Sequence, residues 1–103
     1  MIHVLAILQA KPGMRERILD AYRANVDAVR AEAGCVAYQA VTDARSLPPG
    51  FAQFGADTFV VIEQWASMEA LQAHGVAPHM KAFGAQVKDW IESRAIHVLE
   101  AVR

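Results

Sequence analysis

The sequence has a single cysteine and no long hydrophobic run. With Cys35 alone the chain cannot form an internal disulfide, which favours a reducing compartment. No segment approaches the roughly 20 apolar residues that a membrane-spanning helix needs. The apolar run at residues 4–8 is too short for a signal peptide, and no cationic residue precedes it. We therefore expect a cytoplasmic protein with no membrane partner.

The sequence also lacks an excess of charge of one sign. Ten basic and eleven acidic residues give a net charge of −1, and the two signs are interspersed along the chain. A nucleic-acid-binding surface normally needs a basic stripe or patch. The sequence therefore predicts no nucleic-acid partner.

Apolar residues, by contrast, are abundant. They make up 54% of the 103 residues, against about 45–50% in typical soluble domains. A chain of this length forms one domain, residues 1–103. Small chains with more apolar residues than one core can bury often place the excess in a subunit interface.

The periodicity of the apolar residues predicts alternating strands and helices. Gly34 is suited to end a helix, Ser67 to cap one, and Pro78 to occupy the first position of another. We expect strands over residues 2–10, 35–42, 58–66 and 95–102, a first helix over residues 14–33, two helical segments after Ser67 and Pro78, and a loop over residues 43–57.

This order is βαββαβ, the α+β, ferredoxin-like plan with a four-stranded antiparallel sheet and its helices on one face. Two strands carry apolar residues on both faces, although helices can cover only one. Leu5 and Ile7 lie opposite the face of Val4, as Val60 and Ile62 lie opposite that of Val61. We expect the uncovered apolar face to form a homodimer, sheet on sheet.

Several polar residues fall where a core would normally have hydrocarbon. Asn25 lies on the inward stripe of the first helix, and Glu63 and Trp65 project from the same strand face. His74 and His79 follow this strand, on two helical segments separated by a break. Each could be structural: a hydrogen-bonded amide, a core indole, a carboxylate reaching water, a buried imidazole. Convergence on one cavity would instead make them a site.

The spacing of the two histidines argues against a metal. Five helical residues would place them about 140° apart around the helix axis, and no cysteine or His-x3-His pattern accompanies them. We expect no metal site and no bound cofactor. The loop over residues 43–57 holds two aromatics, Phe51 and Phe54, which we expect either to close the pocket or to pack onto the partner subunit.

Together these residues resemble the antibiotic-biosynthesis monooxygenase (ABM) domain family. The resemblance covers nearly the whole chain. It rests on the KPG turn at 11–13, Asn25, the EAGCVAY run at 32–38, FVVIEQW at 59–65, Ser67, Glu69, Ala70, His74, Pro78-His79 and Phe83.

The resemblance implies a dimeric α+β barrel with one pocket per subunit, between sheet and helices. Members include cofactor-independent monooxygenases that oxidise phenols, quinols or anthrones with O2, haem-degrading enzymes and a sugar-phosphate isomerase. The haem-degrading branch uses an asparagine where this chain has Ala6. Carried onto this sequence, the catalytic positions are Asn25, Glu63, Trp65 and His74. We expect substrate contacts from a further set: Tyr22, Tyr38, Phe51, Phe54, His79 and Phe83.

The expected reaction is the oxidation of a quinol or polycyclic phenol by O2. A phenolate can pass an electron to O2 without flavin or metal if the site ionises the phenol and excludes water. Either Glu63 or His74 could accept the proton. Two alternatives stay open: an isomerase of a small hydroxy-ketone, and a dimeric binding or stress-response module that has lost catalysis.

Overall fold

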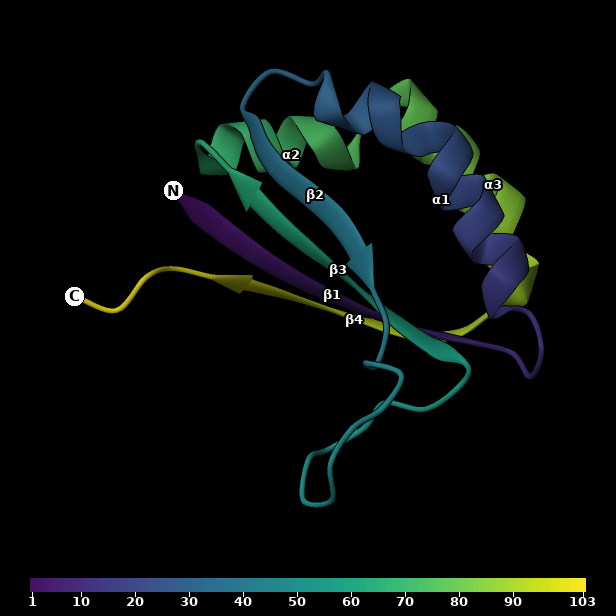
Figure 1. Cartoon of the computed structure of the whole chain (residues 1–103). Coiled ribbons are helices and arrows are strands. Elements are labelled where there is room, and N and C mark those ends of the chain that lie inside the picture. Colours follow the sequence, from purple (N-terminus) through teal and green to yellow (C-terminus); the bar gives the residue numbers. More distant parts are fainter.

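The chain folds into one four-stranded antiparallel sheet with three α-helices (Figure 1). The computed structural model describes all of residues 1–103. The elements follow the order β1 (Ile2–Ala10), α1 (Arg15–Arg30), β2 (Cys35–Val41), β3 (Thr58–Trp65), α2 (Met68–Gly75), α3 (Pro78–Val87), the 3₁₀ turn η1 (Lys88–Trp90) and β4 (Ile91–Leu99).

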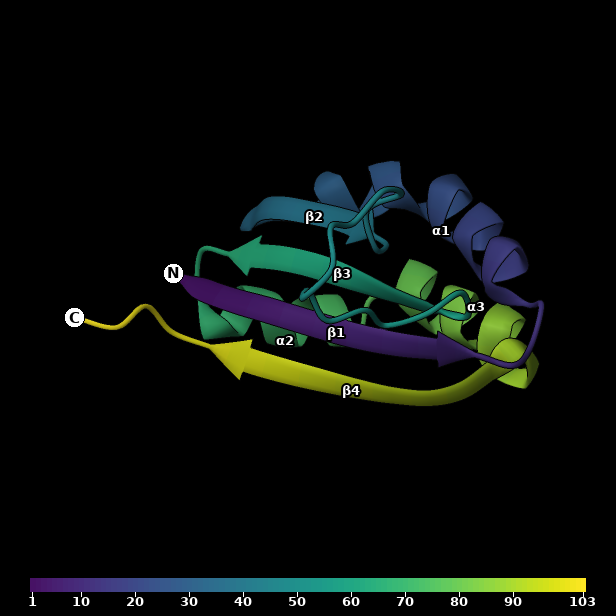
Figure 2. The ribbon, with the colours of Figure 1, turned by 60° about the horizontal axis from the view of Figure 1, so that its bottom comes forward.

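The strand order β2-β3-β1-β4 places the two sequence-distant strands β1 and β3 at the centre. All three pairings are antiparallel. The helices lie on one face of the sheet (Figures 1 and 2). The predicted α+β, ferredoxin-like arrangement is therefore confirmed, including the placement of all helices on one face of the sheet.

The core forms where the sheet meets the helices. In β1 every second side chain, from Ile2 to Ala10, is buried, while the residues between them are mostly half-buried. Phe59, Val61 and Trp65 of β3 face the same side and are almost fully buried. Helix α1 adds Ile18 and Val29, neither of which is exposed to solvent. This period-two burial follows from strand geometry, since alternate side chains point to opposite faces.

Two of the three local signals in the sequence act as expected, whereas Gly34 does not cap α1, whose C-cap is Ala31. The Ser67 hydroxyl accepts a hydrogen bond of 3.1 Å from the backbone N–H of Ala70 and so caps α2. Pro78 occupies the first turn of α3. Gly34 has φ +83°, and a Cβ there would lie 2.5 Å from the Cβ of Ala70. Only glycine satisfies both constraints, so this residue allows α2 to pack against the start of β2.

Two elements differ from the prediction by more than one residue, α1 at its end and the last strand at both ends. Helix α1 ends at Arg30, three residues before the expected end, and residues 31–34 form a turn into β2. The last strand begins at Ile91, four residues before the expected residue 95. Its register with β1 runs from Ala10 opposite Ile91 to His3 opposite Leu99, so every residue of β1 after Ile2 is included in the pairing. β4 is an edge strand and is mostly exposed. It therefore lacks the alternation of buried and exposed residues from which its start could have been predicted.

The sheet face opposite the helices carries the apolar residues for which we predict a dimer. Leu5 and Ile7 are half-buried and Ile62 is 45% exposed, whereas Val60 is buried. The loop between β2 and β3 lies on this side of the sheet (Figures 1 and 2). The face is therefore partly covered by the chain itself, and the dimer stays a prediction.

Candidate active site

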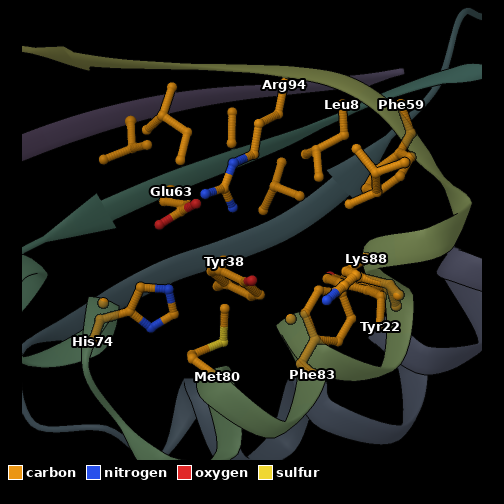
Figure 3. Close-up of a pocket in the computed structure, with 18 of the residues that line it drawn as sticks. Leu8, Tyr22, Tyr38, Phe59, Glu63, His74, Met80, Phe83, Lys88 and Arg94 are labelled. Carbon is orange, nitrogen blue, oxygen red and sulfur yellow. The ribbon is translucent and has the colours of Figure 1, made fainter. Parts of the chain in front are cut away.

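A cavity of about 860 Å³ lies between the helix-facing side of the sheet and the helices (Figure 3). Its size falls in the range of about 300–1,000 Å³ that is usual for small-molecule sites. Most of its lining is hydrophobic, with a few polar groups. The lining residues are Val4, Ala6, Leu8, Tyr22, Tyr38, Phe59, Val61, Glu63, Leu71, His74, Gly75, Met80, Phe83, Gly84, Val87, Lys88, Ile91, Glu92, Ser93, Arg94, Ile96 and Val98.

Aromatic side chains form one wall of the cavity. The rings of Tyr22 and Tyr38 are stacked, with centroids 5.9 Å apart and an interplanar angle of 22°. The Tyr22 hydroxyl accepts a hydrogen bond from the backbone N–H of Ala40 (3.0 Å), which fixes α1 to β2. Phe83 and Met80 of α3 continue this wall (Figure 3). Flat, apolar surfaces of this kind suit a planar aromatic ligand.

Glu63 is the buried acidic group of the cavity. It is 6% exposed, and its Oε1 accepts a hydrogen bond of 2.9 Å from Trp65 Nε1. Burial raises the pKa of Glu63, an effect that the nearby Glu32 carboxylate reinforces and that the Trp65 hydrogen bond and His74 oppose. The raised pKa favours the protonated acid, which can donate a hydrogen bond to a ligand.

His74 lies at the same end of the cavity, next to Tyr38 and Met80 (Figure 3). Only 6% of the residue is exposed. Its Nδ1 is 2.9 Å from Glu32 Oε2, so Nε2 is the ring nitrogen left for a ligand. The ring packs on Trp65, with centroids 4.6 Å apart, and meets the edge of Tyr38 at 5.6 Å.

Trp65 and Tyr38 hold the two polar groups in place. Trp65 is fully buried and does not line the cavity. It therefore acts on a ligand only indirectly, by its hydrogen bond to Glu63 and by packing against the His74 ring. Tyr38 lines the cavity, and burial raises its pKa well above the ordinary value, with the nearby Glu63 carboxylate adding to the shift. Tyr38 is thus kept as a neutral phenol that can donate a hydrogen bond.

Among the residues expected from sequence, Glu63, His74, Tyr22, Tyr38 and Phe83 line one cavity. Asn25 does not. It is half-buried between α1 and α3, where its Nδ2 donates to the sulfur of Met80 (3.4 Å). Tyr22, one turn earlier on α1, occupies the position toward the cavity. The expected convergence of Asn25 with Trp65 and His74 is therefore not seen, because Met80 lies between.

His79 and the loop aromatics also lie outside the cavity lining. His79 turns toward Glu32, with its Nε2 2.7 Å from Oε2. Phe51 and Phe54 are 65% and 54% exposed. Their loop lies on the sheet face opposite the helices, away from the cavity (Figure 1). Within the single chain they lie away from the pocket, and packing onto a partner subunit stays a prediction.

Three charged residues of the site were missed. Glu32 precedes Gly34 in the turn after α1, and its carboxylate contacts both His74 and His79. Lys88 and Arg94 line the cavity, and Arg94 reaches from β4 toward Glu63 (Figure 3). Arg94 was missed because the last strand was predicted to begin after it, at residue 95. Its side chain could therefore not be assigned to a face of the sheet. The available signal for Glu32 was an acidic residue two positions before the glycine of a turn, Gly34.

The structure contains no group of three or more His, Cys, Asp or Glu side chains placed to hold a metal ion. None of its helices combines the length and apolar character needed to cross a membrane.

The sequence and the fold match known proteins. The family model described as "Antibiotic biosynthesis monooxygenase" matches residues 1–86. The "Probable quinol monooxygenase YgiN" of Escherichia coli K12 is 34% identical over 102 residues, which are 97% of each chain. The crystal structure of PA3566 from Pseudomonas aeruginosa aligns with a TM-score of 0.82 at 27% identity, covering 99% of this chain and 94% of that one.

A crystal structure described as an antibiotic biosynthesis monooxygenase aligns over the full length of both chains, with a TM-score of 0.83 and 26% identity. The resemblance inferred from the sequence is thus confirmed by the family match, by a relative and by the fold. The chain belongs to the antibiotic biosynthesis monooxygenase family and has the enzyme class of that family, an oxidoreductase of the monooxygenase type.

Proposed function

We propose that the enzyme oxidises a quinol or polycyclic phenol with O2 and without a bound cofactor. The observation that carries this proposal is the pairing of Glu63 and His74 at one end of a cavity whose wall is made by two stacked tyrosines. An acid and a base then face the hydroxyl end of a flat ring. The similarity to a probable quinol monooxygenase supports the same substrate class.

The two polar groups suit different tasks. The raised pKa of Glu63 lets this side chain hold a proton more readily than an ordinary glutamate does. Nε2 of His74 has no protein partner, so we assign His74 the role of the base that accepts the proton of the substrate hydroxyl. Arg94, which lines the cavity from the exposed strand β4, adds a positive charge that stabilises the phenolate.

The reaction balances without an external reductant. The ionised quinol transfers an electron to O2, and the resulting radical pair combines at a ring carbon. Loss of water from the hydroperoxide leaves a hydroxyquinone, with one oxygen atom of O2 on the ring and the other in water. The quinol supplies all the electrons. The apolar lining would exclude bulk water from the intermediate, and we assign to Glu63, which lines the same cavity, the protonation of the departing oxygen.

We also propose that the enzyme acts as a homodimer. Leu5, Ile7 and Ile62 leave an incompletely covered apolar strip on the sheet face opposite the cavity. On the other face of the sheet, Ile96 and Val98 of β4 line the cavity and are likewise 56% and 46% exposed. Apolar surface of this extent is normally covered by a partner.

The test is a panel of quinols and polycyclic phenols, assayed for O2 uptake with purified enzyme after exhaustive dialysis against chelators. Under ¹⁸O₂, mass spectrometry should find one labelled oxygen in the product. Absorbance spectra of the same sample should lack haem and flavin bands. Turnover of a hydroxy-ketone under argon would instead establish an isomerase, and a ligand-dependent thermal shift without turnover would establish a binding module.

A further inference from the structure

Glu32 shares one carboxylate oxygen between two histidines from different helices. Its Oε2 is 2.9 Å from Nδ1 of His74 in α2 and 2.7 Å from Nε2 of His79 in α3. The Glu32 side chain is only 13% exposed, and that of His74 8%. In both contacts the imidazole nitrogen must be the donor, because a carboxylate oxygen can accept a hydrogen bond but cannot donate one.

This contact determines which tautomer His74 adopts. A carboxylate oxygen at 2.9 Å from Nδ1 requires a proton on Nδ1. The neutral ring then carries a lone pair on Nε2, the nitrogen left for the cavity. Free histidine prefers the opposite tautomer, with the proton on Nε2, so the protein has to impose this one. The same logic applies wherever a buried carboxylate orients a catalytic imidazole.

From this geometry we infer that Glu32 is the positioning residue of the site. It holds His74 with Nε2 ready to accept the substrate proton, and it stabilises the imidazolium that forms when the proton arrives. Trp65 and Tyr38 fix the plane of the ring from two other sides. The role in turnover rests on the proposed function, whereas the tautomer does not.

His79 has a supporting part in the same arrangement. Its side chain is 29% exposed and does not line the cavity. His79 Nε2 donates a hydrogen bond to Glu32 Oε2, the same oxygen that accepts from His74. This second hydrogen bond keeps the Glu32 carboxylate from rotating away from His74. We therefore reassign His79 from the substrate contacts expected from sequence to the orientation of Glu32.

The first test needs no variant. Long-range ¹H–¹⁵N NMR of the wild-type protein distinguishes a protonated from an unprotonated ring nitrogen in each histidine. We expect the neutral His74 ring to carry its proton on Nδ1. A ring protonated on Nε2 would overturn the inference even if the enzyme oxidises quinols. Absence of O2 uptake with every quinol would overturn the proposed function and leave this measurement valid.

The second test compares Glu32→Gln with Glu69→Gln, which removes one carboxylate from the exposed first turn of α2. Removing the partner that orients a functional histidine typically costs about 10–100-fold. We expect Glu32→Gln to lose that much in kcat, with KM within about twofold and with His74 no longer uniformly protonated on Nδ1. Glu69→Gln should match wild type in both. A folded Glu32→Gln protein with unchanged kcat and tautomer would contradict the inference.

Discussion

The cavity has a closed end and an open end, and they are built differently. At the closed end, β3 and α2 bring together Glu63, Trp65 and His74, each at most 6% exposed and each in contact with another. At the open end, β4 offers Ile96 and Arg94, both exposed. Buried, mutually oriented polar groups serve chemistry, because their positions are fixed before a ligand arrives. We expect a ligand to enter at the exposed end.

The largest effect is expected from removing His74, the proposed base of the closed end. Loss of a group that transfers a proton typically costs about 10²- to 10⁴-fold in rate. His74→Ala should therefore lose at least about 10²-fold in kcat for quinol oxidation, measured by O2 uptake. Asn25→Ala is the comparison, since Asn25 contacts Met80 and does not line the cavity.

If Asn25→Ala loses as much turnover as His74→Ala while its melting temperature stays unchanged, Asn25 acts in catalysis as first expected from sequence. A loss of stability with activity falling only in proportion would make Asn25 structural.

A second strong effect should come from the uncovered sheet face. Ile62→Lys places a charge at an apolar position that is 45% exposed in the single chain. Burying that charge in an interface would be costly, so the variant should sediment as a monomer or fail to fold. Ala28→Lys, on an exposed turn of α1, should leave assembly unchanged. Wild-type protein that sediments as a folded monomer at micromolar concentration would refute the dimer.

The open end is tested by Arg94→Gln, which removes a positive charge from the cavity lining on β4. A charge-assisted contact to an anionic ligand contributes roughly 1.5–3 kcal/mol, so KM for an acidic phenol should rise by about tenfold or more. Lys81→Gln, which removes a charge from the exposed surface of α3, is the matched control. Equal KM values for both variants would remove Arg94 from the site.

The sequence predicted the closed end better than the open end. Glu63 and His74 stand out because a charged and a titratable residue interrupt an apolar strand and its following helix, a local pattern that a single sequence displays. The face of β3 then follows from period-two geometry. The first strand, Ile2–Ala10, was predicted to the residue because a Lys-Pro-Gly turn ends it.

What sequence could not supply depends on distant contacts. Glu32 and His74 are 42 residues apart, and nothing in the local pattern of either indicates that they meet. Asn25 was placed toward the cavity because an inward stripe does not say which neighbour it faces, here Met80 of α3. The direction taken by the loop from residue 43 to 57 has no periodic signal at all, so the sequence left open whether its aromatics close the pocket or pack onto a partner subunit.

A smaller effect concerns stability and the raised pKa of Glu63. Because burial raises this pKa above its unfolded value of about 4.3, the folded protein binds the proton more tightly. The resulting stabilisation is present below the unfolded pKa and is lost as pH rises through the folded pKa. Glu63→Gln keeps an acceptor for Trp65 without this titration. The variant should therefore gain stability relative to wild type as pH rises from about 4, measured by urea unfolding. A pH-independent difference would contradict the shift.

The smallest effect on turnover is expected from the loop aromatics. Asp43 accepts hydrogen bonds from the backbone N–H groups of Phe54 (3.0 Å) and Gly55 (2.9 Å), so the loop backbone is held without the aromatic rings. Replacing both Phe51 and Phe54 by Ser should leave kcat, KM and the fold unchanged, because neither ring lines the cavity. If the rings pack against the partner subunit, the dimer of the double variant should be weaker and should dissociate at a higher protein concentration than the wild-type dimer.

Analytical ultracentrifugation over a dilution series measures that dissociation, and Val76→Ser provides the control. Val76 is 64% exposed, like Phe51, but lies at the end of α2 on the helical side of the sheet. A weaker dimer for the double variant alone would assign the loop to the interface. If both variants dissociate as wild type does, the rings do not contribute to the interface. A raised KM in the double variant would show that the loop reaches the substrate after all, through a partner whose cavity lies next to it.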